Sequence, residues 1–305
     1  MQILILNGTV LRSMSKRQRK TKRSIRSLLN DKREFLTLPG VFDALSAKIA
    51  EKTGYPAIFQ TGYGSAATLL GMPDFGLLHA GETIDNARRI IKAVSIPVIV
   101  DIDTGYGNPL NVQRIVRDLE EMGAGGVFLE DQVWPKRCGH MTGKDVIPGE
   151  EFVPKLRAAI DARRSKEFII VARTDARATL GLQEAIRRGI EYYEIGADVI
   201  FVEAPRTLRE LREIPSKIDA PLVANMIEQG VTPNLSSHQL KKMGYKIAVF
   251  PLSGLYTSAF ALRDIFTELM RTGSTKNSRR RMVTFDDFNR LVGLSEYMNL
   301  AKKYA

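Results

Sequence analysis

The feature that most constrains the fold is a regular alternation of short apolar runs with longer amphipathic segments, which begins at Leu36. Runs rich in β-branched and aromatic residues predict strands, and segments of helical period predict helices. The eight predicted strands cover residues 36–39, 57–60, 98–103, 126–130, 169–173, 199–203, 222–225 and 247–251. Helices are predicted between them, at 81–94, 109–122, 150–164, 181–195 and 236–243. Strands that alternate with helices pair in parallel, and eight such units predict a (β/α)8 TIM barrel of the α/β class.

Polar residues stand where six of the predicted strands end. They are Thr61 and Gly62, Asp101 and Asp103, Glu130 and Asp131, Arg173 and Asp175, Glu203, and Asn225. Active sites of such barrels lie at the C-terminal ends of the strands. Polar groups at these positions would otherwise need partners in a mostly apolar neighbourhood. The pattern therefore predicts a functional site at this end of the barrel.

The basic charge of the chain is concentrated at its start. Residues 1–34 hold ten Lys/Arg and two Asp/Glu, so they carry +8 of the total net charge of +11. A basic tail can contact nucleic acid or membrane, but no zinc-finger, helix-turn-helix or RNA-recognition signature accompanies it. We expect a solvated, partly disordered tail over 1–34, one barrel domain over 35–305, and neither a nucleic-acid nor a membrane partner. Met14 is an alternative start to Met1, because the preceding apolar run is too short for a secretory signal.

Composition sets the expected compartment. Apolar residues make up 44% of the chain, which is enough for a large core, and no stretch approaches the roughly 20 apolar residues that span a bilayer. The single cysteine cannot form an internal disulfide. A reducing, cytoplasmic setting is the simplest interpretation.

The two carboxylates of Asp101 and Asp103 are candidate metal ligands. Residues i and i+2 of a strand point to one face, so both could reach one hard cation. Mg²⁺ typically takes one or two carboxylates and keeps waters that substrate oxygens can replace. Asp74 and the pair Glu130-Asp131 could add direct or water-mediated contacts. The sequence therefore predicts a Mg²⁺ site, with Mn²⁺ as a substitute; the alternative is that these aspartates cap a loop.

The only thiol of the chain lies in the segment 136–140, which reads Lys-Arg-Cys-Gly-His. Neighbouring cations lower the pKa of a thiol, and Gly139 and Gly143 would let the loop move as a lid. Acid, base and nucleophile all stay open for Cys138, beside the alternative of a buried inert cysteine. Arg173 is a candidate carboxylate clamp, because a guanidinium binds a carboxylate with two hydrogen bonds; the alternative is a structural ion pair.

Together these segments resemble the isocitrate lyase/phosphoenolpyruvate mutase superfamily, over about residues 36–304. The most specific match is Glu-Asp-Gln at 130–132 followed by Lys-Arg-Cys-Gly-His at 136–140. Further matches are Thr61-Gly62-Tyr63, Pro73-Asp74, Asp101-Ile102-Asp103, Ala172-Arg173-Thr174-Asp175, Phe201-Val202-Glu203-Ala204 and Asn225-Met226-Ile227-Glu228.

The resemblance implies roles for these residues. Asp74, Asp101, Asp103 and Glu130 would form the Mg²⁺ region. Substrate would contact Thr61, Gly62, Tyr63, Gly139, Arg173, Glu203 and Asn225, and the catalytic group would comprise Lys136, Cys138 and His140. The resemblance also implies a homotetramer in which the last barrel helix is exchanged between subunits. Such an exchange would account for late helical stretches with apolar residues, such as Phe285 and Phe288, that a closed barrel cannot bury.

The segment around Cys138 resembles the lyase form of the superfamily, whereas members that act on carbon–phosphorus bonds resemble one another in having asparagine there. We therefore expect a Mg²⁺-dependent carbon–carbon lyase in which Cys138 protonates the leaving fragment. The expected substrate is a 2-hydroxy di- or tricarboxylate of the 2-methylisocitrate or 2,3-dimethylmalate type, cleaved to pyruvate or a related oxo acid plus succinate or propionate. Tyr256 stands where methylisocitrate lyases typically carry an arginine, and the choice stays open. Phosphonopyruvate hydrolase or carboxyphosphonoenolpyruvate phosphonomutase is the alternative.

Overall fold

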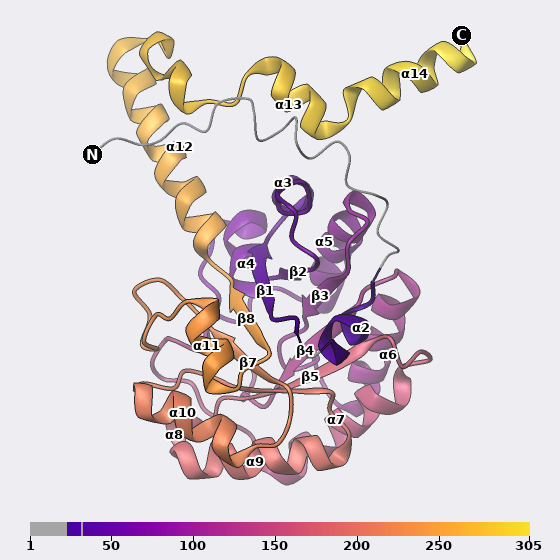
Figure 1. Ribbon diagram of the computed structural model, residues 1–305, viewed down its shortest axis with the longest axis vertical. Helices are drawn as coiled ribbons and strands as arrows, with labels where there is room; N and C mark the ends of the chain where they lie inside the picture. Colours follow the sequence, from indigo (N-terminus) through magenta and orange to yellow (C-terminus); the bar gives the residue numbers. More distant parts are fainter. Residues whose placement is uncertain (1–22, 32) are drawn as a thin grey trace.

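The computed structural model describes residues 23–31 and 33–305 and contains a closed barrel of eight parallel strands (Figure 1). Neighbouring strands pair in sequence order, and β1 pairs with β8 to close the sheet. The strands are β1 Leu36–Val41, β2 Ile58–Gln60, β3 Val98–Asp101, β4 Gly126–Glu130, β5 Ile169–Thr174, β6 Val199–Val202, β7 Leu222–Asn225 and β8 Ile247–Phe250. The predicted TIM barrel is confirmed, and each predicted strand overlaps an observed one.

The helices alternate with the strands and surround the barrel (Figure 1). Several begin at a residue whose side chain accepts a hydrogen bond from the first turn, such as Asp43 and Asn108, which is the usual way to satisfy these backbone N–H groups. The helices are α2 Ile25–Asn30, α3 Ala44–Thr53, α4 Gly62–Leu70, α5 Ala80–Ala93, α6 Pro109–Glu121, α7 Gly149–Ala162, α8 Ala176–Thr179, α9 Leu182–Ile195, α10 Leu208–Lys217, α11 Ser237–Met243, α12 Ser253–Thr272, the 3₁₀ helix η2 Lys276–Arg281, α13 Phe285–Val292 and α14 Leu294–Tyr304.

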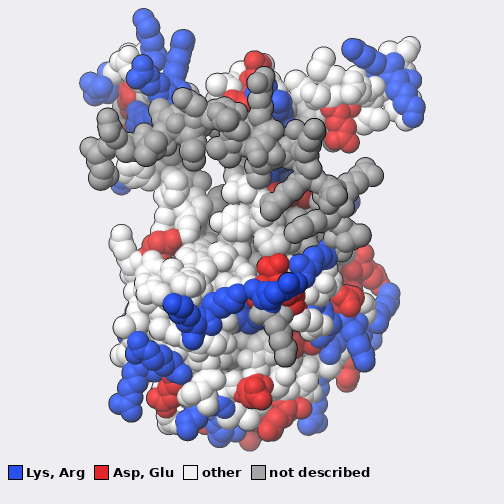
Figure 2. Space-filling model, in the orientation of Figure 1, with Lys and Arg blue, Asp and Glu red and all other residues white. Residues whose placement is uncertain are grey.

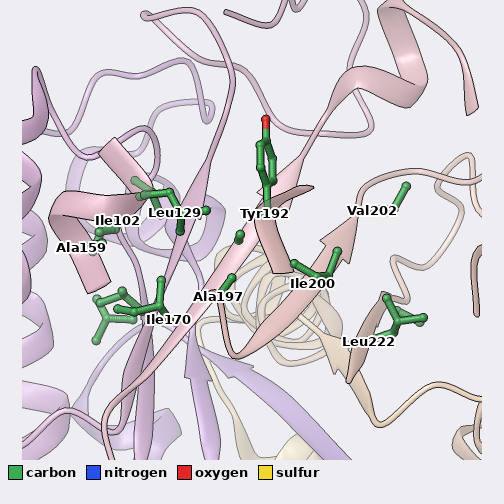
Figure 3. Packing of buried hydrophobic residues seen from close by; sticks show 14 of the residues in the cluster. Ile102, Leu129, Ala159, Ile170, Tyr192, Ala197, Ile200, Val202 and Leu222 are labelled. Carbon is green, nitrogen blue, oxygen red and sulfur yellow. The ribbon is translucent and has the colours of Figure 1, made fainter. Parts of the chain in front are cut away.

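Two apolar layers hold the barrel together. Inside it, Phe128 packs edge-on against Phe59 and Phe201, with ring centroids 4.7 and 5.8 Å apart. Outside it, strand residues such as Ile170 and Ile200 pack against the helices, together with the fully buried ring of Tyr192 (Figure 3). Successive strand residues thus face opposite layers, and both layers are apolar, as expected for parallel strands buried on both sides.

A short helix, α2, lies in the segment that the sequence analysis assigned to the basic tail. Its residues Ile25 and Leu28 are buried in the apolar cluster of the barrel interior. The Arg26 guanidinium lies 2.6 Å from a carboxylate oxygen of Asp198, which stands just before β6. Part of the basic segment is therefore integral to the barrel, and the first 22 residues of the predicted tail lie outside the described residues.

The C-terminal helices leave the barrel. Helix α12 points away from it, α13 contacts the barrel helix α3, and α14 continues from α13 to the C-terminus (Figure 1). None of these three helices contains a buried residue. They carry large exposed apolar side chains, among them Phe260, Phe266, Met270 and Phe285, which are 62%, 61%, 89% and 83% exposed. This is much more exposed apolar surface than scattered single residues would give.

In the described part of the chain, no helix is long and apolar enough to cross a membrane. On the face of the barrel shown in Figure 2, Lys and Arg side chains are interspersed with Asp and Glu.

We expect Leu28→Ala to lower the free energy of unfolding by about 2–5 kcal/mol, because it opens a cavity where α2 meets the barrel interior. Urea denaturation measures this change. The matched control is Ser27→Ala on the exposed face of the same helix, with an expected change below about 0.5 kcal/mol. Equal stabilities for the two variants would contradict the assignment of α2 to the core.

Candidate active site

A cavity at the C-terminal ends of the strands gathers most of the residues predicted from the sequence. Its lining residues are Phe59, Thr61, Tyr63, Asp74, Asp101, Lys136, Cys138, Gly139, Arg173, Phe201, Asn225, Ile227, Val249, Pro251 and Leu252. Four other predicted residues do not line the cavity but contact residues that do: Gly62, Asp103, Glu130 and Glu203. His140 lies farther from the cavity, against Glu203. The apolar part of the wall was missed, because Phe59, Phe201 and Val249 look like ordinary strand residues in the sequence.

Helix α4 begins at the cavity and orients its first peptide groups. Thr61 caps this helix by accepting a hydrogen bond from the Gly64 backbone, and the Gly62 backbone N–H donates to a carboxylate oxygen of Asp101 over 3.3 Å. A Cβ atom on Gly62 would lie 3.0 Å from the same oxygen, so the close approach favours glycine. A helix N-terminus with free N–H groups attracts anions. This end of the cavity is therefore suited to a carboxylate.

Lys136 reaches from the loop after β4 into a group of buried carboxylates. Its ammonium lies 2.6 Å from Asp74 and 2.6 Å from Asp103, and all three side chains are at most 8% exposed. Burial lowers the pKa of Lys136, but Asp103 and Asp74 outweigh burial and raise it well above its usual value. Lys136 is therefore a permanent cation in the closed site and not a base.

Asp101 and Asp103 are arranged differently from the sequence prediction. Strand β3 ends at Asp101, and Asp103 lies beyond it with a left-handed backbone, φ 49°. The two carboxylates nevertheless approach the same point, because a Cβ atom on Gly62 would lie 3.0 Å from an oxygen of Asp101 and 3.4 Å from an oxygen of Asp103. The Asp103 N–H also donates to Asp101 over 3.1 Å. Burial, together with the charge of Asp103, raises the pKa of Asp101 to about 6. Because the ionised form of Asp101 is disfavoured in this buried position, a bound cation would stabilise that form.

The carboxylates fit a hard divalent cation. One oxygen of Glu130, Oε1, is buried and has no hydrogen-bond partner among the described residues. Burial raises the pKa of Glu130 well above its usual value. Oxygen donors of this kind are what Mg²⁺ prefers. As they stand, no three acidic, His or Cys side chains of the described chain converge on one point, because the Lys136 ammonium lies between Asp74 and Asp103.

Arg173 is held by carboxylates and also lines the cavity. Its Nε lies 2.7 Å from Asp175 and 3.2 Å from Glu130, and its Nη1 lies 3.5 Å from Glu203. The guanidinium also stacks 5.2 Å above the ring of Phe201. The structural ion pairs are therefore present, and the role of Arg173 as a clamp for a substrate carboxylate stays a prediction.

A second layer of contacts supports Arg173 from behind. Asp131 is fully buried and accepts hydrogen bonds from the backbone N–H of Asp175 and the side chains of Arg188 and Tyr192, each over 2.9 Å. It therefore points away from the cavity and is unavailable to a metal there. The sequence grouped Asp131 with Glu130, but adjacent strand-end residues face opposite sides.

Cys138 lies at the cavity with a protonated thiol. Burial raises the pKa of Cys138 to about 11. The expectation of a lowered pKa was wrong, because burial, aided by the charges of Asp74 and Glu203, outweighs the lowering effect of Lys136. The positive charges of this segment are also paired with other groups. Lys136 is paired with Asp74 and Asp103, while Arg137 stacks 5.2 Å from Phe75 and donates to a loop carbonyl.

His140 lies behind Glu203 instead of in the cavity wall. Its Nε2 is 3.0 Å from a carboxylate oxygen of Glu203, and its Nδ1 accepts a hydrogen bond from the Val231 N–H over 3.0 Å. Asn225 donates to both oxygens of Glu203 over 3.2 Å. Burial would raise the pKa of Glu203, but Arg173 and His140 together lower it. The described residues therefore hold Glu203 as a carboxylate at neutral pH.

Comparison with known proteins finds relatives over most of the chain. The family model described as phosphoenolpyruvate phosphomutase matches residues 25–269. The chain is 42% identical to 2,3-dimethylmalate lyase of Eubacterium barkeri over 93% of this chain and 98% of that protein. It is 48% identical to the chloroplastic carboxyvinyl-carboxyphosphonate phosphorylmutase of Arabidopsis thaliana, over 91% and 83%. It is 41% identical to 2-methylisocitrate lyase of Aeropyrum pernix, over 88% and 86%.

Solved structures give the same result. Oxaloacetate acetylhydrolase in complex with 3,3-difluorooxalacetate superimposes with a TM-score of 0.87 at 33% identity, over 92% of this chain and 96% of that chain. Phosphonopyruvate hydrolase in complex with oxalate and Mg²⁺ superimposes with a TM-score of 0.82 at 29% identity, over 92% and 97%. The fold, the strand-end residues and these likenesses agree, and the chain belongs to the phosphoenolpyruvate mutase/isocitrate lyase superfamily.

Proposed function

We propose that this chain is a metal-dependent carbon–carbon lyase acting on a small 2-hydroxy dicarboxylate. The observation that carries the proposal is the Cys138 thiol, which stays protonated at neutral pH and faces the same cavity as Asp101 and Arg173. A thiol with a pKa of about 11 is a proton donor at neutral pH and a poor nucleophile. The similarity to a 2,3-dimethylmalate lyase and a 2-methylisocitrate lyase supports the same reaction class.

Each part of the cavity has a place in this reaction. The N-terminus of α4, at Thr61 and Gly62, would bind the carboxylate next to the hydroxyl-bearing carbon. Arg173 would contact the substrate with the guanidinium that its acidic partners fix in position. Asp101 and Asp103, with Asp74 and Glu130 around them, would hold Mg²⁺ or Mn²⁺. The metal would stabilise negative charge on the oxygen that becomes the keto group.

The proposed bond cleavage accounts for two protons and one electron pair. A base takes the proton of the 2-hydroxyl, the C2–C3 bond breaks, and its electron pair stays on the leaving carbon. The Cys138 thiol gives its proton to that carbon, which releases a carboxylic acid and leaves an oxo acid behind. Loop closure would keep water from the carbanion. Lys136 is too firmly protonated to be the base.

The cavity wall favours a dicarboxylate over a tricarboxylate. Among the described residues that line it, the cationic ones are Lys136 and Arg173, and both are already paired with carboxylates. The remaining wall includes Phe201, Ile227 and Val249, which suit an alkyl group better than a third carboxylate. Tyr256 stands where an arginine could have bound that carboxylate, and a phenol cannot replace a guanidinium there. We therefore favour a 2-alkylmalate, such as 2,3-dimethylmalate, over 2-methylisocitrate.

Carbon–phosphorus chemistry on the same fold is the second candidate function. It is favoured by the similarity to the Arabidopsis phosphorylmutase and to phosphonopyruvate hydrolase. It is disfavoured by Cys138, because the phosphonate enzymes resemble one another in having asparagine there. Phosphorus NMR of phosphonopyruvate incubated with the enzyme and Mg²⁺ discriminates the two, since a lyase leaves its spectrum unchanged.

We also propose that the enzyme is a cytoplasmic homotetramer in which α12 to α14 pack on neighbouring subunits. The exposed apolar residues of these helices support an assembly that covers them. An apolar groove lined by Val41, Ile49 and Phe250, beside the start of α12, offers a matching surface on the barrel.

The first prediction concerns the reaction. With Mg²⁺, we expect an oxo acid from a 2-alkylmalate, with a higher kcat/KM than for 2-methylisocitrate. We expect Cys138→Ser to lower kcat by about 100-fold or more, because a hydroxyl is a much weaker acid, while KM stays within about threefold. A coupled dehydrogenase assay measures the oxo acid.

The control for Cys138→Ser is Thr142→Ala, an exposed change in the same loop, for which full activity is expected. The absence of oxo acid from every 2-alkylmalate, isocitrate and methylisocitrate tested would overturn the proposed function. An unchanged kcat for Cys138→Ser would remove the thiol from the mechanism.

The second prediction concerns the thiol itself. Iodoacetamide reacts with thiolates, so the alkylation rate of Cys138 should rise roughly tenfold per pH unit up to pH 10, without levelling. This follows from its pKa of about 11. Because the chain has one cysteine, intact-mass spectrometry follows the reaction directly. A plateau below pH 9 would show an ordinary thiol and contradict the burial argument.

The third prediction concerns assembly. Light scattering should give a mass near four times the 34.1 kDa of the chain. Phe260→Glu combined with Phe266→Glu should give smaller species, because charges on α12 would oppose burial of this surface. Exchanging the exposed Glu167 for Gln on the barrel is the control. A monomeric wild-type protein would contradict the assembly.

A further inference from the structure

The loop segment 136–144 covers the cavity and is tied down at several points. The Cys138 N–H donates to the Asp74 carbonyl over 3.3 Å. The Lys144 ammonium lies 2.8 Å from Asp175 and also donates to the Gly139 carbonyl. The contacts of Cys138 and Lys144 with Asp74 and Asp175 bind the loop to neighbouring elements. The imidazole of His140 adds contacts with Glu203 and Val231, and the proposed reaction gives this side chain no role.

The two ring nitrogens of His140 face two different elements. Nδ1 accepts a hydrogen bond from the backbone N–H of Val231, so it carries no proton, and the proton of the neutral ring is on Nε2. Nε2 lies 3.0 Å from Glu203 at the end of β6, although its N–H is not aligned with the oxygen as in an ideal hydrogen bond. The side chain is 7% exposed and does not line the cavity. Neither nitrogen is therefore available to a substrate in the closed site.

Two glycines make these approaches sterically feasible. A Cβ atom on Gly230 would lie 2.4 Å from Nδ1 of His140, and a Cβ atom on Gly139 would lie 2.4 Å from Cγ of Glu203. Contacts this short do not occur between real atoms, so a side chain at either position would push the loop away. The backbone of Gly230 lies outside the left-handed region, so its conformation tolerates alanine. The obstacle is space: the added Cβ atom would meet the His140 ring first and would lie 3.1 Å from Cβ of Ile227.

We infer that His140 is a positioning residue whose ring holds the loop segment 136–144 over the cavity. We call the contacts of this ring with Glu203 and Val231 the latch, and Gly230 leaves the space that the ring needs. The neutral ring fastens the loop to Glu203 on one side and to the 227–231 turn on the other, and so places the adjacent Cys138 at the cavity. The expected fall in kcat/KM of latch variants rests on the proposed function, whereas the effect of His140 on the position of the loop does not. His140 takes no proton from the substrate and gives it none.

Limited proteolysis tests the latch without substrate. Trypsin cleaves after Arg137 and Lys144 only when the loop opens, so the cleavage rate reports the open population. We expect Gly230→Ala and His140→Ala to raise cleavage at these two sites at least about tenfold. His140→Asn, whose side-chain oxygen can still accept from Val231, should give an intermediate rate. The matched controls are Gly81→Ala, at an exposed glycine with open space around it, and His238→Asn on exposed α11; both should match wild type.

Fluorescence and kinetics supply independent readouts. Trp134 is the one tryptophan of the chain, stands two residues before the loop, and packs 5.8 Å from the ring of Tyr106. Its emission should shift in the same variants that are cleaved faster, and kcat/KM should fall by a similar factor in Gly230→Ala and His140→Ala. Loss of activity in His140→Ala with wild-type cleavage and emission would overturn the inference and assign His140 to the chemistry. Wild-type behaviour of Gly230→Ala in all three measurements would also overturn it.

Discussion

The burial of a carboxylate cluster at the mouth of the barrel is the constraint on which the rest of this site depends. Asp74, Asp103 and Asp175 are each at most 6% exposed. Asp74 and Asp103 share the Lys136 ammonium, and Asp175 is paired with Lys144 and Arg173. Buried carboxylates are tolerated when cations pair with them. One such cation, Lys136, belongs to the loop that covers the cavity. The loop therefore supplies part of the positive charge that neutralises the cluster.

The same pairing decides the chemistry of Cys138. The positive charges beside it in the sequence are engaged by carboxylates and an aromatic ring, so burial is the dominant influence on the thiol and raises its pKa to about 11. The sequence left acid, base and nucleophile open. The structure favours the acid, because a thiol in this state holds its proton until a stronger base, such as a carbanion, arrives beside it.

The sequence predicted those features that depend on local pattern. Strand periodicity specified the barrel, and polar residues at strand ends located the cavity, because parallel strands end on one side. It did not predict properties that arise from distant contacts. The pKa of Cys138 depends on the carboxylates with which Lys136 pairs across the site. Asp103 lies beyond the end of β3, in a turn with a left-handed backbone. Helix α2 was not predicted, because its two buried apolar residues, Ile25 and Leu28, lie in a segment rich in basic residues.

Charge balance connects the cluster to the substrate. Around the cavity, six carboxylates (Asp74, Asp101, Asp103, Glu130, Asp175 and Glu203) face three cations (Lys136, Lys144 and Arg173). Burial is the main cause of the raised pKa values of Asp101 and Glu130, and neighbouring carboxylates add to it. A divalent metal and a dicarboxylate together add no net charge to this group. A tricarboxylate adds one more buried negative charge without a partner, which is costly in a site of this kind. This charge balance supports the proposal of a dicarboxylate substrate.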